Sequence, residues 1–499
     1  MKKIPVVQHD FYGGVADDIR HGNGNSFAIT KHFDIFSSPS RLTPYRSLEV
    51  DTNDGSTSTG MKQYLVKDFV YASSSAKLFG LGQTGGGLTK IVQKADATTG
   101  NWSLPATSEG NGAVLNGCLV EYKAALWGFQ GTNQVWKWVI ATNTITNTVT
   151  GTLGATITSV AQGVIAKDDN LYLPYNNIIA RVTAAGTLVD AVLTLPTNFK
   201  ITSICNFGNY LAIGCAPVST YNGTSKVFLW NLTSSDVQES IDWGEGELRI
   251  LETIEGSLVG VTDRYLNNAT GAGTGSMIIQ MYGGGAPQVI KEVFTQALVG
   301  KTMPLSKAVK NNRIFFAAKI MTDTAGTTYN EGIWSFGRKN ANYSHTMTLD
   351  IIDENIDTDG IQGFGMAANY FFIAHSGDGS IDKTDDTAAY AFTSVLETTL
   401  FDAGDVTADK TLLSLDIAMV KLATGQTLTT KYKVDGATSW TTIGTHSTVG
   451  AISYTFLNEE SNSNVMFASG REYQFRIEST GGLEITGFLA TFTINSTPS

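Results

Sequence analysis

Several features that common protein classes require are scarce in this sequence. Only 16% of its 499 residues are charged, the net charge is −11, and no basic run is longer than two residues. Nucleic-acid-binding proteins need clustered Lys and Arg, so we expect no nucleic-acid partner. The three cysteines are too few for a disulfide framework. Cys205 and Cys215 flank one apolar run and would pair if neighbouring strands brought them together; the alternative is small, buried thiols.

Long hydrophobic runs are missing as well. No window approaches the roughly 20 apolar residues that span a bilayer, so we expect no membrane insertion. The opening stretch MKKIPVVQHDFYGG lacks the apolar core of a secretion signal. These absences predict a soluble protein that is synthesised in a cytoplasm.

What the sequence does contain favours β-structure. Glycine is abundant, with 52 residues, and Thr, Ser and Asn occupy many of the remaining polar positions. β-branched residues suit pleated strands, while Gly and Asn suit tight turns. Amphipathic helical patterns are hard to find, and the composition predicts an all-β fold.

A short pattern, an apolar pair or triplet just after a small or polar turn, recurs seven times between about residues 65 and 390. Successive occurrences lie 40 to 57 residues apart, and they begin at Leu78, Leu126, Leu171, Leu211, Leu258, Ile314 and Phe371. Such a period accommodates the four antiparallel strands of one propeller blade. We therefore predict a β-propeller of about seven blades over residues 61–390, with six or eight blades as alternatives. A β-solenoid or a string of sandwiches would show other periods.

The two ends of the chain differ from this repeat. Residues 1–60 form a predicted N-terminal arm, which would either supply a clasp strand to the last blade or reach a neighbouring subunit. Residues 391–499 alternate between apolar and polar positions, which predicts an antiparallel β-sandwich or jelly roll. In this domain Tyr473, Phe475 and Ile477 are expected to point inward, opposite Gln474 and its polar neighbours.

Both ends carry a resemblance to a known group of proteins. The stretch FYGGVADDIR…FAITKHFDIFSSPSRLTPYRSLE at residues 11–49 resembles the N-terminus of a group of tailed-bacteriophage virion proteins. The stretches YKVDGATSWTTIGTH and YQFRIESTGGLEITG are similar to the C-terminal sandwich of the same group. The resemblance implies a structural role in a phage tail or tail tip, and it assigns no functional residues.

A search for catalytic motifs finds none, and we predict that the protein is not an enzyme and binds no organic cofactor. The six histidines lack zinc-ligand spacing, and no nucleophile elbow, P-loop or dinucleotide fingerprint is present. Glycoside hydrolysis would need two convergent carboxylates. The candidates lie in IDWGEGE (Asp242, Glu245, Glu247) and LDIIDE (Asp350, Asp353, Glu354), where solvated loop carboxylates are the competing interpretation.

Calcium is the ion that the sequence fits best, as a structural ion. Asp357 with Asp359, and Asp378 with Asp382, place oxygen ligands at alternate positions, as a hard cation prefers. Asp51 begins a similar run. None of these runs completes an EF-hand, and as ordinary turns they need no metal.

Trp102 and Trp243 lie in loop-like sequence, where they would either stack on a sugar or partner, or cap the edge of a blade. The remaining tryptophans fall within the strand pattern and are expected in the core.

The resemblance at the two ends implies a structural component of a phage virion, assembled in the host cytoplasm as a homo-oligomer with other tail proteins and possessing surfaces for host attachment. Two alternatives remain open: a tail spike that binds a receptor or degrades a host glycan, and a capsid decoration protein. Location on head or tail, the host, its receptor and the oligomer order do not follow from the sequence.

Overall fold

The chain folds into many small, mostly antiparallel β-sheets in the computed structural model, which confirms the all-β prediction. In the described part of the chain there is no helix, and hence none long and apolar enough to cross a membrane. The structure describes residues 3–8, 11, 13–16, 26–38, 40–46, 48–51, 64–84, 89–94, 102–104, 119–130, 133–140, 145–218, 223–265, 275–295, 307–321, 329–352, 361–367, 370–375, 380–384, 390, 392–405, 407–457 and 467–494.

Two compact units make up the chain. Unit 1 comprises residues 1–47, 321–353 and 385–499, and unit 2 comprises residues 48–320 and 354–384. These limits differ from the predicted boundaries at residues 60 and 390. The difference arises because β1 and β3 of the N-terminal stretch pair with β39 and β33 of the C-terminal region, and because residues 321–353 fall in the same unit.

Unit 2 contains a series of small sheets that follow one another along the sequence. Their strand orders are β7-β8-β9, β10-β11-β12-β13, β14-β15-β16-β17, β18-β19-β20-β21, β22-β23-β24-β25 followed by β27 with β26, and β30-β31-β32-β6. The strands are β6 (Leu48–Val50), β7 (Tyr64–Ala72), β8 (Lys77–Thr84), β9 (Thr89–Lys94), β10 (Val120–Tyr122), β11 (Ala125–Gln130), β12 (Gln134–Ile140), β13 (Ile145–Thr152), β14 (Val164–Ile165), β15 (Leu171–Tyr175), β16 (Ile178–Val182), β17 (Leu188–Thr194), β18 (Phe199–Phe207), β19 (Tyr210–Pro217), β20 (Thr224–Trp230), β21 (Glu239–Glu245), β22 (Glu247–Ile254), β23 (Ser257–Tyr265), β24 (Gly275–Tyr282), β25 (Gln288–Thr295), β26 (Ala308–Lys310), β27 (Arg313–Met321), β30 (Ile361–Ala367), β31 (Tyr370–His375) and β32 (Ile381–Thr384).

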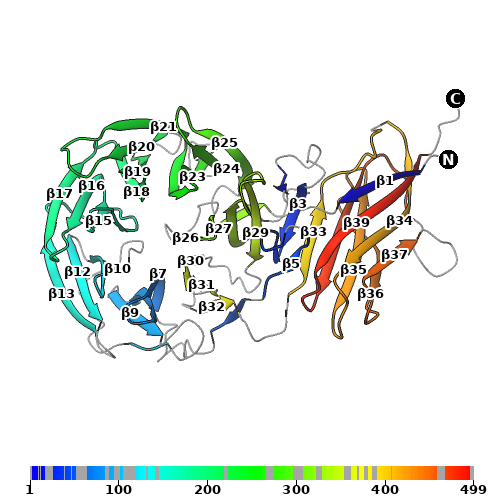
Figure 1. Cartoon of the computed structure of the whole chain (residues 1–499), viewed down its shortest axis with the longest axis horizontal. Coiled ribbons are helices and arrows are strands. Elements are labelled where there is room, and N and C mark those ends of the chain that lie inside the picture. Colours follow the sequence, from blue (N-terminus) through cyan, green and yellow to red (C-terminus); the bar gives the residue numbers. More distant parts are fainter. Residues whose placement is uncertain are drawn as a thin grey trace. The chain divides into compact units, whose positions relative to one another are not determined.

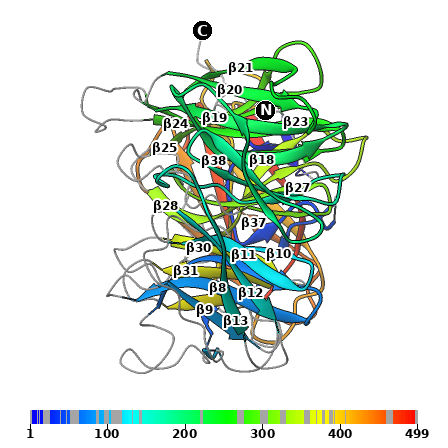
Figure 2. The ribbon, with the colours of Figure 1, turned by 90° about the vertical axis from the view of Figure 1, so that its left-hand side faces the viewer.

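The seven predicted repeat positions all lie on strands of this series and all are buried. They occur on β8, β11, β15, β19, β23, β27 and β31, and each of these strands pairs with the strand directly before it in the chain. Within unit 2 the sheets follow an arc, with the first strand of each sheet on the inner side and the last on the outer side (Figure 1). Figure 2 views this arc from its outer strands.

Hydrophobic cores lie between successive sheets of unit 2. Trp127 and Phe129 of β11 share one core with Leu173 and Tyr175 of β15. Other cores join the sheets that begin at β30 and β7, β7 and β10, β14 and β18, and β18 and β22. The four sheets from β7 to β21 therefore each bury apolar side chains against two neighbours, and burial of this kind supplies the main favourable term in folding.

A strand from near the N-terminus completes the sheet built by residues 361–384. β6 pairs antiparallel with β32, so that Leu48 lies opposite Thr384. Asp51, which directly follows β6, donates its backbone N–H to the carbonyl of Ile381 over 2.8 Å. Residues 48–50 of the predicted N-terminal arm thus supply the fourth strand of this sheet, and the clasp role stays a prediction.

Polar contacts between hairpin turns also connect neighbouring sheets. The Glu121 carboxylate accepts hydrogen bonds from the backbone N–H of Ser73, at 2.8 Å, and of Ser74, at 3.0 Å, in the preceding sheet. The Lys123 ammonium contacts Asp169 in the following sheet over 2.7 Å. Ser73, Ser74, Lys123 and Asp169 are exposed and Glu121 is half-buried, so each contact contributes little stability by itself.

Unit 1 contains two larger sheets, ordered β1-β39-β34-β37 and β2-β3-β33-β38-β35-β36, and the pairs β4-β5 and β28-β29. The strands are β1 (Lys3–Gln8), β2 (Gly14–Val15), β3 (Ser26–Lys31), β4 (Phe33–Asp34), β5 (Thr43–Pro44), β28 (Tyr329–Gly337), β29 (Thr346–Ile352), β33 (Ser394–Thr398), β34 (Lys410–Met419), β35 (Thr427–Val434), β36 (Thr441–His446), β37 (Ser453–Leu457), β38 (Tyr473–Thr480) and β39 (Ile485–Ile494).

Aromatic side chains from the two larger sheets of unit 1 pack against one another. Phe475 on β38 lies with its ring centroid 6.1 Å from that of Phe488 and 6.2 Å from that of Phe492, both on β39. Tyr473 and Ile477 are fully buried beside Phe475, as the alternating pattern predicted. Gln474, expected to face solvent, is buried too, because its amide donates to the carbonyl of Thr398 on β33.

Glycine at position 260 allows Trp243 to pack flat on the next sheet. A Cβ atom at Gly260 would lie 2.6 Å from the indole ring, and both residues are in the interior. We expect Gly260→Ala to lower the free energy of unfolding by about 1–3 kcal/mol through overpacking. Gly283→Ala is the matched control, since its new Cβ would meet only the Ser257 hydroxyl at 3.4 Å. Urea unfolding of the two variants tests this, and equal effects would contradict it.

Candidate functional site

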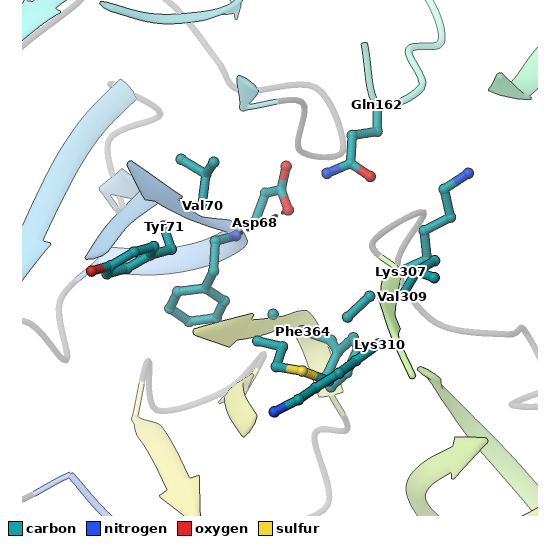
Figure 3. A pocket seen from close by; sticks show the side chains of 12 residues that line it. Asp68, Val70, Tyr71, Gln162, Lys307, Val309, Lys310 and Phe364 are labelled. Atoms are coloured by element: carbon teal, nitrogen blue, oxygen red, sulfur yellow. Dashed lines mark hydrogen bonds between the residues drawn. The ribbon is translucent and has the colours of Figure 1, made fainter. Parts of the chain in front are cut away.

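A pocket of about 480 Å³ lies where inner strands of unit 2 approach one another. It is lined by residues of β7, β26 and β30, with Gln162 from the segment before β14 and Lys307 from the segment before β26 (Figure 3). The lining residues are Asp68, Phe69, Val70, Tyr71, Gln162, Lys307, Ala308, Val309, Lys310, Phe364, Gly365 and Met366. Its volume falls in the range of about 300–1,000 Å³ that is usual for small-molecule sites.

Asp68 supplies the carboxylate in the pocket lining. Its Oδ1 accepts the backbone N–H of Phe69 at 2.9 Å, and its Oδ2 accepts that of Leu119 in the next sheet at 2.9 Å. The residue is 2% exposed. Both oxygens are therefore engaged by backbone donors, and the carboxylate joins two sheets at the inner side of the arc.

Lys307 is the first of two lysines in the pocket lining. Its ammonium lies 2.9 Å from Glu252 Oε2 and 3.4 Å from the Ile204 carbonyl, and it donates to the Leu251 carbonyl and the Ser203 hydroxyl. These groups belong to β18 and β22. The charge of Lys307 is thus balanced by a carboxylate, and the residue ties the inner strands of two sheets together.

Lys310, on β26, is the second lysine in the pocket lining. Burial lowers the pKa of its ammonium, and the nearby Arg313 charge lowers that pKa further. The two residues lie directly opposite each other in the β26–β27 hairpin. Arg313 also lies over the Phe315 ring, 4.7 Å from its centroid.

The carboxylates considered for glycoside hydrolysis do not come together in the structure where it describes them. Asp242 is exposed and pairs with Lys226 at 2.8 Å. Glu247 is buried between Lys200, at 2.6 Å, and Arg249, at 2.8 Å. Glu245 is exposed, Asp350 is buried on β29 in the other unit, and Asp353 and Glu354 lie outside the described residues.

The calcium candidates are placed only in part. Asp357, Asp359 and Asp378 lie outside the described residues. Asp382 is buried on β32, with Oδ2 3.3 Å from His375 Nε2. Asp51 is fully buried, and its Oδ2 accepts hydrogen bonds from Lys94 Nζ and, at 3.0 Å, from Trp102 Nε1. Over the described ranges, no group of three or more His, Cys, Asp or Glu side chains is placed to hold a metal ion.

The two tryptophans that the sequence placed in loops are buried. Trp243 is 1% exposed on β21, and Trp102 is 5% exposed beside Phe69 and Phe372. The interpretation of either as an exposed stacking platform is wrong, because each ring fills a core between sheets. The alternative, packing at the edge of a sheet, agrees with the position of Trp243 on an outer strand.

Cys205 and Cys215 are both free and buried on the neighbouring strands β18 and β19. Burial raises the pKa of the Cys205 thiol to about 12 and raises that of Cys215 as well. Since the thiolate is the reactive form, we expect neither to be alkylated by iodoacetamide at pH 8 in the native protein. Peptide mass spectrometry after labelling, with urea-unfolded protein as the control, tests this. Rapid native labelling at either position would contradict it.

No family model matches the chain, and no curated protein sequence matches it. Among solved structures, the chain is similar to an extracellular domain of a two-component system of B. thetaiotaomicron, with 13% identity, TM-score 0.36, and coverage of 74% of this chain and 52% of that one. It is also similar to the N-terminal domain of Nup159 (9% identity, TM-score 0.39, coverage 72% and 99%) and to a chain of a mitotic checkpoint complex (11% identity, TM-score 0.41, coverage 68% and 94%). The chain thus spans about half the length of the first of these.

Proposed function

We propose that this protein is a structural, non-catalytic component of a tailed-phage virion, located in the tail or tail tip. It would assemble in the host cytoplasm as a homo-oligomer, act through contacts with other tail proteins, and offer surfaces for host attachment. One observation carries the proposal: the stretches that resemble virion proteins, although they lie at opposite ends of the chain, build one sheet. In its order β2-β3-β33-β38-β35-β36, β2 and β3 come from the first stretch and β38, β35 and β36 from the last.

We also infer the finer architecture. The sheets of unit 2, with β26 to β29 as a seventh blade, would form a seven-bladed propeller that β6 closes. Support comes from the seven buried repeat positions and from the cores between successive sheets. The two larger sheets of unit 1 would form the β-sandwich, supported by the ring contacts between β38 and β39.

A role without covalent chemistry is supported by the state of the described carboxylates. Asp68 is held by backbone donors, and Asp242 and Glu247 are paired with cations. Groups prepared for acid–base catalysis are usually placed in pairs at one cleft with opposed environments. The described part of unit 2 has no such pair at its pocket.

Quantitative mass spectrometry of purified phage particles tests the proposal. A few to about a dozen copies per particle, as expected for a symmetric tail component, support it. Hundreds of copies, or antibody labelling of the head, would replace the tail role with a capsid decoration role. Absence from the particle would overturn the virion role, and clearing of host polysaccharide by the purified protein would replace it with that of a degrading spike.

A further inference from the structure

β37 ends one of the two larger sheets of unit 1, and in the described part of the chain its outer edge takes no second strand. In the order β1-β39-β34-β37 it pairs with β34 alone, in a regular register without a bulge (Figure 1). Edges that a fold leaves open usually carry charged residues, proline or a bulge, because their unpaired N–H and C=O groups otherwise pair with another strand. The sequence of β37, SYTFL, contains no charge and no proline.

Other strands that end a sheet do carry such features. β1, at the opposite end of the same sheet, has Lys3 and Pro5. β36 ends the second larger sheet, and its pairing with β35 contains a bulge between Thr430 and Lys431. β21, the last strand of its sheet in unit 2, is rich in acidic residues. The edge of β37 is therefore suited to pairing with another strand.

Alternate residues of β37 direct their backbone groups away from β34. Just before the strand, the Ile452 carbonyl accepts the Met419 N–H over 2.9 Å. Residues that bond to the neighbouring strand alternate along an antiparallel pair. The even-numbered residues of β37 therefore bond to β34, and the odd-numbered residues present their N–H and C=O groups at the outer edge. Thr455, the central residue of the strand, is one of these.

The side chains of β37 also alternate between the two faces of the sheet. Tyr454 and Phe456 lie on the inner face, because they are opposite the fully buried Ile417 and Leu415 on β34. Tyr454 is nevertheless 37% exposed, and its ring stacks on that of His446 with 3.8 Å between the centroids. A further strand alongside β37 would cover the exposed part of this ring.

We propose that β37 pairs antiparallel with β37 of a second copy of this chain, around a twofold axis at Thr455. In this register Thr455 lies opposite its own counterpart, and Ser453 lies opposite Leu457. Residues that present backbone groups outward thus meet one another and exchange hydrogen bonds. Tyr454 lies opposite Phe456 of the second copy, which is a favourable aromatic pair on the inner face. Because the strand has no charged residue, the symmetry brings no like charges together.

The pairing would join the β1-β39-β34-β37 sheets of two copies into one continuous sheet. It gives the homo-oligomer of the proposed function a specific interface, and it rests on that part of the proposal. The strand is its own complement in length, hydrogen-bonding pattern and charge, so a second copy supplies everything that the edge requires. All the residues involved belong to unit 1.

Analytical ultracentrifugation of the full-length protein tests the pairing with two variants at one position. Thr455→Pro removes the outward N–H and should weaken association about tenfold or more, because the pair of residues at the axis loses both of its hydrogen bonds. Thr455→Val is the matched control. It too loses the hydroxyl, which donates to Asp416, but it keeps the N–H and should retain the association.

Cysteine crosslinking tests the register. Thr455→Cys places two thiols opposite each other across the axis, where Cα atoms of a hydrogen-bonded pair lie about 5.5 Å apart, a separation that a disulfide accepts. Oxidation with copper phenanthroline should therefore give a disulfide-linked dimer. The wild type should give none, and neither should Val7→Cys, at an exposed residue of β1 at the other end of the same sheet.

Several outcomes would overturn the inference. Association unchanged by Thr455→Pro would place the interface elsewhere and leave the proposed homo-oligomer standing. Equal weakening by Thr455→Pro and Thr455→Val would show that the backbone N–H is not used. A monomeric wild type would remove both this pairing and the homo-oligomer, whereas the virion role is tested on particles. Circular dichroism must show that the variants fold, and if Thr455→Pro does not, the crosslink of Thr455→Cys decides.

Discussion

Asp51→Ala should lower the free energy of unfolding of unit 2 by about 3–5 kcal/mol, because it leaves a buried lysine without its carboxylate. The side chains of Asp51 and Lys94 are both fully buried, and the carboxylate also accepts the Trp102 indole N–H. Asp51 directly follows β6, so the same contact holds the end of β6 against the β7-β8-β9 sheet. Urea unfolding followed by tryptophan fluorescence measures the loss, since six of the eight tryptophans belong to unit 2.

Two further variants distinguish the effect of breaking the buried Asp51–Lys94 pair on stability from the effect of removing any charge. Asp242→Ala breaks an exposed pair with Lys226 in the same unit and should cost about 0–1 kcal/mol. The double variant Asp51→Leu with Lys94→Met should recover much of the stability lost by Asp51→Ala, because it removes both buried charges at similar volume. If Asp51→Ala lowers the stability no more than Asp242→Ala, the Asp51–Lys94 contact does not hold β6 in place.

The repeat in unit 2 was predictable because it depends on local pattern. Leu78 and Leu126 each follow a turn and begin a buried second strand, and five further positions behave in the same way. Tight turns and apolar strand starts leave a signal within a few residues of sequence. The inward-facing Tyr473 and Phe475 were predictable for the same reason, since alternation along one strand needs no partner to be visible.

Contacts between distant segments were not predictable in this way. Asp51 was interpreted as a possible calcium ligand from the spacing of its neighbours, whereas the cation that it contacts is Lys94, 43 residues away. No sequence motif surrounds Lys307. It connects two sheets because its ammonium contacts backbone carbonyls and a carboxylate that belong to both of them. The packing of the sheets determines which residues become partners. The periodicity of a single sequence carries no information about that packing.

For Trp243, local composition predicts a loop, whereas the residue lies on the outer strand β21. The surrounding IDWGEGE is rich in Gly and acidic residues, which is typical of a loop. In the structure β21 is the outermost strand of its sheet, so alternate residues are exposed while Ile241 and Trp243 point inward. Gly260 on the next sheet provides the space for the indole ring, and that pairing lies outside any local window.

In unit 1 the largest effect is expected from Phe475→Ala, which should lower the free energy of unfolding by about 3–5 kcal/mol. The ring is fully buried and touches Phe401, Phe488 and Phe492, so its removal leaves a cavity between the two larger sheets. Hydrogen exchange with mass spectrometry should show lost protection in residues 467–494, because β38 and β39 both line that cavity.

The location of the lost protection makes this test specific. Ile452→Ala, at a residue that is 66% exposed, removes a comparable apolar side chain of unit 1 and should change protection little. Residues 171–217 of unit 2 should keep their protection in Phe475→Ala, because their core is built by other side chains. Uniform loss across both units would show that the chain unfolds as one cooperative body, and the two compact units would then not be independent in stability.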